Sequence, residues 1–207
     1  MQKQTITLAI TGASGSIYGM HALKFLLEHD YQVDLVLSET ARKVMQLELD
    51  LDVTDADAAQ TRKSVLKHIE WADEQNKLRL WHPDNLAARV SSGSYRTSGM
   101  LIMPCSMGAV GRIASGTSQD LIARCADVCL KERFKLVLVV REMPFNLIHL
   151  QNMLTLAQAG AIIAPAMPAF YHRPKTMNEL IGFVVGKALD VFGIDNQLFE
   201  RWLQTRV

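Results

Sequence analysis

The chain has 207 residues, of which 49% are hydrophobic, so it can bury a substantial core, and we expect one domain. Its 22 basic and 21 acidic residues nearly cancel and form no sustained basic run, which argues against a nucleic-acid partner or a membrane surface. It has no apolar stretch long enough to cross a membrane and no signal-peptide pattern at the first residues, so we expect a cytoplasmic protein.

Short apolar runs alternate with longer amphipathic segments. The runs predict strands at residues 5–11, 33–38, 78–81, 99–104, 135–140 and 161–166. Helical patterns lie at residues 16–29, 39–48, 61–70, 108–132, 146–159 and 176–192. This alternation predicts a parallel sheet of about six strands with helices on both faces, a three-layer α/β/α domain of the Rossmann or flavodoxin type.

The last residues, 193–207, carry Phe199, Trp202 and Leu203 at helical spacing. We expect a C-terminal helical arm here. It either closes over the core or packs on a neighbouring subunit.

The first predicted strand ends in a turn that carries Gly12, Ser14 and Gly15 and leads into a helix. Such a turn gathers backbone N–H groups at a helix N-terminus, which favours an anion and above all a phosphate. The spacing Gly-x-x-Gly-x-x-x-Gly differs from the Gly-x-Gly-x-x-Gly of NAD enzymes. The turn therefore predicts a phosphorylated ligand that is not bound in the ordinary dinucleotide manner.

Two further strand ends carry serines. Ser38 follows the second strand, where NAD enzymes place an acid that holds the ribose; this favours a mononucleotide such as FMN, although the adjacent Glu39 keeps the NAD alternative open. Ser106 and Gly108 follow the fourth strand and supply a second group of donors. Both serines are also suited to cap the helices that follow them.

Charged and aromatic residues follow the last two strands. Arg141 directly follows an apolar strand and should contact a ligand or form an ion pair, and Glu142 beside it could neutralise it or donate a proton. Tyr171 lies in an aromatic loop, residues 168–174, which either packs on the domain or offers a hydroxyl to a phosphate.

Cysteine and histidine usage indicates neither a disulfide framework nor a metal site. Cys105, Cys125 and Cys129 are too few and too irregularly spaced, and we expect them to be buried in a reducing compartment. The six histidines form no ligand-spaced pair, so no metal is expected.

Several segments, in order along essentially the whole chain, resemble the UbiX-type flavin prenyltransferases, historically labelled 3-octaprenyl-4-hydroxybenzoate carboxy-lyases. They are residues 11–15, Glu48 with Asp50, residues 91–94, 104–106, 124–127, 130–133, 140–144, 149–150, 152–153 and 169–174. The Leu-Lys-Glu-Arg, Arg-Glu-x-Pro and Phe-Tyr-His-x-Pro segments carry most of the specificity.

The resemblance implies a flavodoxin-like fold and a homododecamer with FMN bound at subunit contacts. The implied reaction joins dimethylallyl phosphate to reduced FMN at N5 and then C6, without a metal. The product, prenylated FMN, would serve a UbiD-type decarboxylase in ubiquinone biosynthesis.

The resemblance also implies roles for individual residues. FMN would be held by Gly12, Ala13, Ser14, Ser38, Ser106, Met107, Gly108, Ala109 and Arg141. The phosphate of the prenyl donor would be surrounded by Lys131, Arg141, Tyr171 and Lys187, with Arg124 nearby. The catalytic group would comprise Ser14, Glu48, Lys131 and Glu142. Lys187 departs from relatives with arginine there, and it lacks the planar fork of a guanidinium.

Two other functions compete with this hypothesis. An FMN-dependent decarboxylase of the phosphopantothenoylcysteine type would need a catalytic histidine early in the chain and a Pro-x-Met-Asn motif. Here His21 lies within the first predicted helix, and Met177-Asn178 follows Thr176. A non-catalytic flavoprotein would bind FMN but would not need the cluster of Lys131, Arg141, Glu142 and Tyr171.

Overall fold

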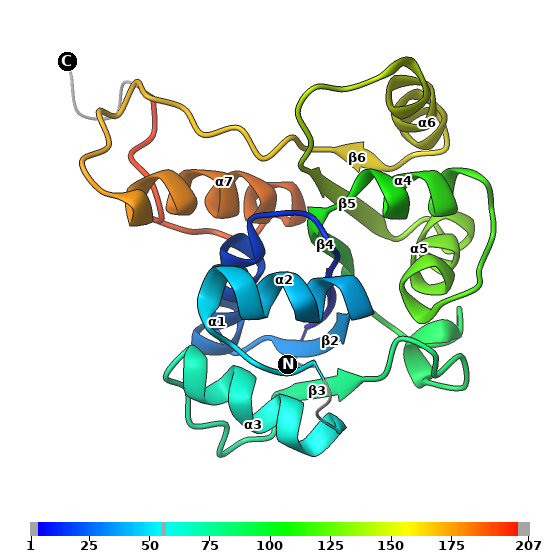
Figure 1. Cartoon of the computed structure of the whole chain (residues 1–207), viewed down its shortest axis with the longest axis horizontal. Helices are drawn as coiled ribbons and strands as arrows, with labels where there is room; N and C mark the ends of the chain where they lie inside the picture. Colours follow the sequence, from blue (N-terminus) through cyan, green and yellow to red (C-terminus); the bar gives the residue numbers. More distant parts are fainter. Residues whose placement is uncertain (1–3, 55–56, 203–207) are drawn as a thin grey trace.

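Six parallel strands form one sheet in the order β3-β2-β1-β4-β5-β6, which confirms the predicted fold class (Figure 1). The structure is a computed structural model that describes residues 4–54 and 57–202. The strands are β1 (Thr5–Ile10), β2 (Gln32–Leu37), β3 (Leu78–Trp81), β4 (Gly99–Cys105), β5 (Lys135–Val140) and β6 (Ile162–Ile163).

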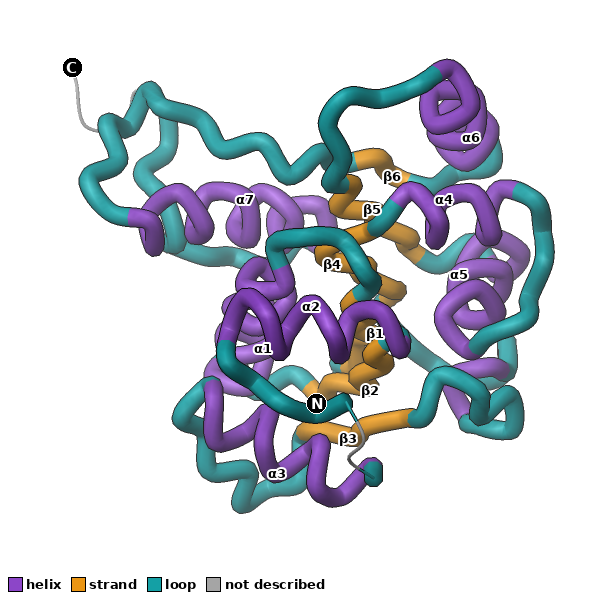
Figure 2. The backbone as a smooth tube through the Cα atoms, in the orientation of Figure 1, coloured by secondary structure: helices purple, strands orange, loops and turns teal. Residues whose placement is uncertain are grey.

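Helices cover both faces of the sheet, and each face has its own buried cluster (Figure 2). One cluster joins the sheet to α1 (Ser16–Glu28), α2 (Glu39–Leu49), α3 (Ala58–His68) and α7 (Met177–Phe192). The other joins it to α4 (Met107–Ala114), α5 (Leu121–Glu132), α6 (Leu147–Gln158) and the short 3-10 helix η1 (Arg89–Ser91). All seven residues of β4 are buried, as expected for a central parallel strand.

The single long helix predicted over residues 108–132 is wrong. The structure has two helices there, α4 and α5, separated by residues 115–120. Gly116 adopts a left-handed φ of 69°, and the side chain of Asp120 accepts a hydrogen bond from the backbone N–H of Ala123 at 2.8 Å. A left-handed residue ends the first helix and the aspartate cap starts the second, although apolar spacing continues across the break.

The predicted C-terminal helical arm is also wrong over residues 193–202, which contain no helix. Gly193 ends α7 with a φ of 73°, and an irregular segment then runs back along that helix (Figure 1). Phe199 is buried from this segment, so the apolar spacing reflects packing. Leu203 and the residues after it lie outside the described part of the chain.

Within the described ranges no helix has the length and apolar content to cross a membrane.

Candidate active site

The glycine-rich turn after β1 is occupied by a carboxylate from the same chain. Gly15 has a φ of 103° and donates its backbone N–H to Glu48 Oε2 at 2.9 Å, while the N–H of Ser16 donates to the same oxygen at 3.1 Å. Glu48 comes from the last turn of α2 and takes the position that a side-chain cap would fill. The backbone N–H groups of this turn, which were predicted to bind an anion, thus bind the Glu48 carboxylate and hold it in a fixed position.

A cavity of about 510 Å³ opens beside this turn. Its polar wall includes Ser14, Glu48 and Arg141, and its apolar wall comes mainly from Ile17, Leu49, Ala166, Met177 and Ile181. Charged and hydroxyl groups therefore face an apolar wall across one space, a combination suited to a ligand with both polar and hydrocarbon parts.

Arg141 links two strand ends at this cavity. Its backbone N–H donates to the Cys105 carbonyl at 3.1 Å, and its Nε donates to the Ser14 carbonyl at 2.9 Å. The guanidinium is thereby oriented at the edge where β1, β4 and β5 end. Arg141 thus lies at this edge directly after β5, and the contact with a ligand expected for it stays a prediction.

Ser38 and Ser106 cap the helices that follow them. Ser38 Oγ accepts from the Ala41 N–H at 3.1 Å, and Ser106 Oγ accepts from the Ala109 N–H at 3.3 Å. Thr11 joins the two nearby turns, because its hydroxyl donates to the Pro104 carbonyl at 2.9 Å and accepts from the Ser106 N–H at 2.8 Å. The N-termini of α1, α2 and α4 are thus gathered at the same sheet edge.

The other predicted flavin-binding residues lie close to this edge, and they are either buried or glycines. Ala13, Met107 and Ala109 are buried, so their backbone groups are what they can offer to a ligand. Gly12 is needed for close approach, because a Cβ there would lie 2.3 Å from Thr40 Cγ2. At Gly108 a Cβ would meet nothing closer than 3.8 Å, which leaves open space beside the first turn of α4.

Arg124 and Lys131 form a second group away from the cavity. Arg124 donates from Nε to the Ser91 carbonyl at 3.2 Å and pairs with Asp127 at 2.7 Å. Lys131 pairs with Glu132 at the end of α5, against Gly93. Because α5 ends just before β5 begins and Arg141 directly follows β5, the six residues of that strand separate Lys131 from Arg141 by roughly 20 Å.

Tyr171, in the loop before α7, and Lys187, on α7, lie in a third region. The Tyr171 ring contacts the rings of Phe183 and Trp202, with centroids 5.9 and 5.0 Å apart. Lys187, one helical turn beyond Phe183, lies 3.6 Å from Asp190. Among the described residues lining the cavity beside Ser14, none of Arg124, Lys131, Glu142, Tyr171 or Lys187 is found. One chain therefore does not bring the predicted substrate-binding residues together.

Tyr18 is a cavity residue that the sequence reasoning missed. It lies on the first turn of α1, and burial raises its pKa, although the nearby Arg141 lowers it in part. The phenol therefore stays protonated near neutral pH and can donate a hydrogen bond into the cavity. Its position three residues after Gly15, on the first turn of the helix, was the signal that could have found it.

The thiols and His21 lie outside this chemistry. All three cysteines are free and buried, and burial raises the pKa of Cys105 and of Cys129 to about 12, which makes them poor nucleophiles. His21 faces a separate cavity with Lys24 and His68, and burial lowers its pKa. In the described parts of the chain no cluster of three or more His, Cys, Asp or Glu side chains could hold a metal ion.

Comparisons with known proteins agree with this geometry. The Flavoprotein family model matches residues 1–189. The chain is 48% identical over 200 residues to flavin prenyltransferase UbiX of Alkalihalophilus pseudofirmus, covering 97% of this chain and 96% of the relative. A crystal structure of AnUbiX in complex with FMN and dimethylallyl pyrophosphate superposes with a TM-score of 0.85, at 39% identity and with 97% and 98% of the two chains covered.

A second solved structure bears on assembly. A dodecameric FMN-dependent UbiX-like decarboxylase from Escherichia coli O157:H7 gives a TM-score of 0.83 at 36% identity and covers 96% of this chain and 99% of its own. Fold, strand-edge cavity and relatives lead to one conclusion. The chain belongs to the UbiX flavin prenyltransferase family.

Proposed function

We propose that this chain is a flavin prenyltransferase that joins the dimethylallyl group of dimethylallyl phosphate to reduced FMN, first at N5 and then at C6. The C–O bond to phosphate breaks, two bonds to the flavin form, and prenylated FMN and phosphate leave. The observation that carries the proposal is the cavity in which Arg141, Ser14 and Glu48 face an apolar wall at the carboxyl ends of the strands. The name and the bound ligands of the relatives support it.

The residues at the strand edge fit a flavin mononucleotide. Ser38 and Ser106 hold the exposed first turns of α2 and α4 at one edge, where N–H groups favour a phosphate. Gly108 leaves open space for a close approach. Reduced FMN supplies the electron-rich ring that accepts the prenyl group, and Gly12, Ala13, Ser14, Met107, Ala109 and Arg141 would complete its cradle.

Glu48 is suited to move a proton during the reaction. Backbone N–H groups of Gly15 and Ser16 hold its carboxylate in place beside Ser14 and the cavity. Closing the second bond releases the proton at flavin C6, and a fixed carboxylate can accept it. We assign Glu142 as the second acid–base group and Ser14 as a relay between the two.

Cations stabilise the phosphate as it leaves. The charge on the leaving oxygen grows as the allylic C–O bond breaks, so preplaced cations lower the barrier. We assign this role to Arg141 together with Arg124, Lys131 and Lys187, and we assign the Tyr171 hydroxyl as a donor to the same phosphate. An apolar wall keeps water from the allylic group in the meantime.

The active site is completed by neighbouring copies. Lys131 lies roughly 20 Å from Arg141 in one chain, on the basis of the length of β5, and Arg124 is held by Ser91 and Asp127 outside the cavity beside Ser14. An exposed apolar surface on and before α6, comprising Met143, Leu147, Ile148 and Leu154, offers a contact face for another copy. We propose a homododecamer, as in the Escherichia coli neighbour.

The alternative of a cysteine-type decarboxylase finds no support at this edge. It needs a catalytic histidine early in the chain, and His21 faces a different cavity from the one beside Ser14. The three buried free cysteines fit a reducing compartment, and we place the reaction in the cytoplasm.

The product would serve as the cofactor of a UbiD-type decarboxylase in ubiquinone biosynthesis. The test is to incubate the protein with reduced FMN and a prenyl donor, to remove the protein by filtration, and to add the filtrate to such a decarboxylase prepared without cofactor. We expect decarboxylation only when the prenyl donor was present, and dimethylallyl monophosphate and diphosphate should be compared in parallel. Equal activation by FMN alone would contradict the proposal.

A further inference from the structure

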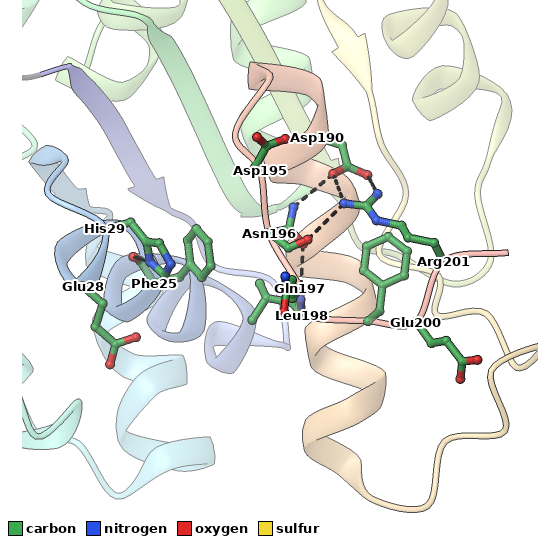
Figure 3. Close-up of a pocket in the computed structure, with 11 residues that line it drawn as sticks. Phe25, Glu28, His29, Asp190, Asp195, Asn196, Gln197, Leu198, Glu200 and Arg201 are labelled. Carbon is green, nitrogen blue, oxygen red and sulfur yellow. Dashed lines mark hydrogen bonds and ion pairs between the residues drawn. The ribbon is translucent and has the colours of Figure 1, made fainter. Parts of the chain in front are cut away.

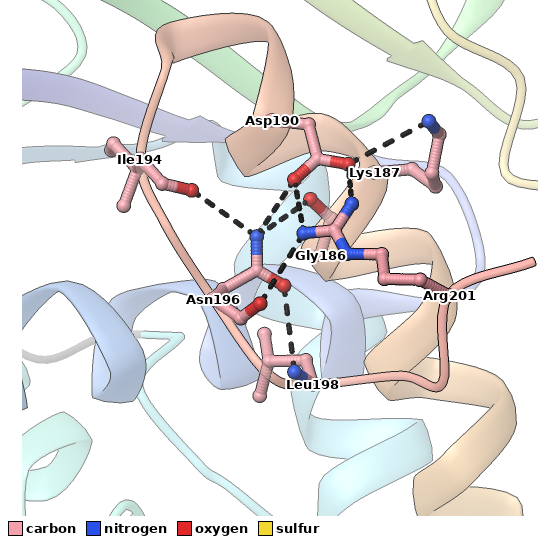
Figure 4. Close-up of polar contacts among 7 residues, drawn as sticks. All are labelled: Gly186, Lys187, Asp190, Ile194, Asn196, Leu198 and Arg201. Atoms are coloured by element: carbon pink, nitrogen blue, oxygen red, sulfur yellow. Dashed lines mark hydrogen bonds and ion pairs between the residues drawn. The ribbon is translucent and has the colours of Figure 1, made fainter. Parts of the chain in front are cut away.

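Asp190 sits at the centre of a network that involves Lys187 and the C-terminal segment (Figure 4). Lys187 Nζ lies 3.6 Å from Asp190 Oδ2. Arg201 contacts the same oxygen with one terminal nitrogen and donates from the other to Asp190 Oδ1 at 2.8 Å. One carboxylate thus faces two cations, and the shorter contacts belong to Arg201.

The segment that carries Arg201 is anchored on both sides of this pair. Asn196 donates from Nδ2 to Asp190 Oδ1 at 3.0 Å and to the Gly186 carbonyl at 3.1 Å. Phe199 is buried, and the Arg201 guanidinium lies 4.4 Å from its ring centroid. The segment and α7 also line a cavity of about 1170 Å³, in which Asp190 and Arg201 appear but Lys187 does not (Figure 3). Lys187 therefore does not line this cavity, although it faces the same carboxylate oxygen as Arg201 (Figure 4).

Charge balance gives this arrangement a consequence. Asp190 and Arg201 together are neutral, so the charge of Lys187 stays available to an anion. Without Arg201 the carboxylate would be left to Lys187, and the group would be neutral as a whole. Burial of Asp190 raises its pKa, but the hydrogen bonds from Arg201 and Asn196 and the charges of Arg201 and Lys187 together outweigh this and leave the pKa below its usual value, so the carboxylate is ionised at neutral pH. Asp195 also faces Arg201, and it stabilises the charged guanidinium.

We propose that Arg201 is a positioning residue that neutralises Asp190 and so frees Lys187 to bind the phosphate of the prenyl donor. The inference rests on the proposed function, in which Lys187 contacts that phosphate. The proposal also explains how a lysine can bind the phosphate at position 187. A guanidinium can bind a carboxylate and a phosphate at the same time, whereas an ammonium group paired with Asp190 is less available to the phosphate, so a lysine needs Arg201 to neutralise Asp190.

The test is a double-mutant cycle on the full-length protein, with two readouts. One is the dissociation constant of dimethylallyl phosphate, measured by calorimetry without flavin. The other is KM and kcat for the same donor. Arg201→Gln should weaken binding and raise KM about tenfold with little change in kcat, the effect of losing about one unit charge near the surface. Asp190→Asn combined with Arg201→Gln should bring both values back toward the wild type.

The rescue separates this proposal from a merely structural role. If Arg201 only anchors the C-terminal segment, the double variant keeps that segment detached and binds the donor as poorly as Arg201→Gln alone; that result would overturn the inference. In a Lys187→Met background, Arg201→Gln should change the dissociation constant by less than about twofold, because no charge is left to free. A further tenfold loss there would also overturn it.

Failure of the proposed function gives a different pattern. If the wild-type protein binds dimethylallyl phosphate and the cycle behaves as predicted but no prenylated flavin forms, the inference stands and the reaction is wrong. If prenylated flavin forms and Lys187→Met leaves binding and KM unchanged, the inference is wrong and the reaction stands.

Discussion

At the scale of single residues, Glu48 is the side chain whose placement says most about the chemistry. It belongs to α2 but is fixed by backbone N–H groups of the β1–α1 turn, at the wall of the cavity. Capping of α1 alone would not require the glutamate to line a cavity. Its place beside Ser14 and Arg141 is the reason for proposing that it moves a proton.

Replacing Glu48 by glutamine tests this assignment. The amide keeps one oxygen for the backbone donors, so FMN affinity should stay within about twofold of the wild type, while turnover should fall by about 100-fold or more. Glu39→Gln, at the exposed start of the same helix, is the matched control and should leave both values unchanged. FMN titration and product formation measure the two effects, and full turnover by Glu48→Gln would refute the role.

A second test at this scale concerns close approach in the turn. In Gly12→Ala the new Cβ would lie 2.3 Å from Thr40 Cγ2, so α2 and the turn must separate. We expect a loss of about 1–3 kcal/mol in the free energy of unfolding, measured by urea denaturation, together with weaker FMN binding. Gly108→Ala is the control: its Cβ has room and alanine favours a helix, so stability should not fall.

At the scale of elements, the sequence predicted the sheet well and the helices less well. Strands such as residues 135–140 are continuous apolar runs, because both faces of a parallel strand are buried, and this signal is local. The break between α4 and α5 was missed because apolar spacing persists on both sides, while a left-handed Gly116 and the Asp120 cap end one helix and start the next. The predicted C-terminal helix failed for the same reason: the apolar spacing that includes Phe199 is helical, but Phe199 packs on α7 from an irregular segment.

The attachment of that segment to α7 should depend on pH in a defined direction. The folded-state pKa of Asp190 is lowered, so its contribution to stability is fully present above the unfolded value of 3.8 and is lost as the pH falls through the lower folded value. Asp190→Asn should therefore lower the free energy of unfolding by about 1–2 kcal/mol at pH 7. Urea denaturation at a series of pH values should show that difference shrinking below pH 3.8, and a constant difference would contradict the pairing.

At the scale of the whole molecule, one chain brings together only part of the predicted site. The residues near Ser14 meet because parallel strands end at one edge, which could be predicted from strand order. Lys131 and Arg124 could not be placed from the sequence: α5 carries Lys131 toward the start of β5, and the side chain of Arg124 is held by Ser91 and Asp127. We propose that another copy supplies them to the site.

Mixed assemblies test this division of labour. Chains with Glu48→Gln and chains with Lys131→Met should each be inactive alone. Coexpressed in equal amounts, they should regain about a quarter of the wild-type activity, because random assembly pairs an intact Glu48 with an intact Lys131 of another chain at about one site in four. Paired Glu48→Gln and Ser14→Ala chains, whose defects share one cavity, are the control and should regain far less. No recovery in the first mixture would place both residues in one chain.

The most direct test of prenyl transfer is the mass of the flavin. The purified protein is incubated anaerobically with reduced FMN and dimethylallyl phosphate. The flavin is then extracted, and its mass is measured by mass spectrometry. Prenyl transfer predicts a product heavier by one five-carbon prenyl unit, absent without the protein or the donor. Flavin that stays bound to the protein with its mass unchanged, while both substrates are present, would contradict it.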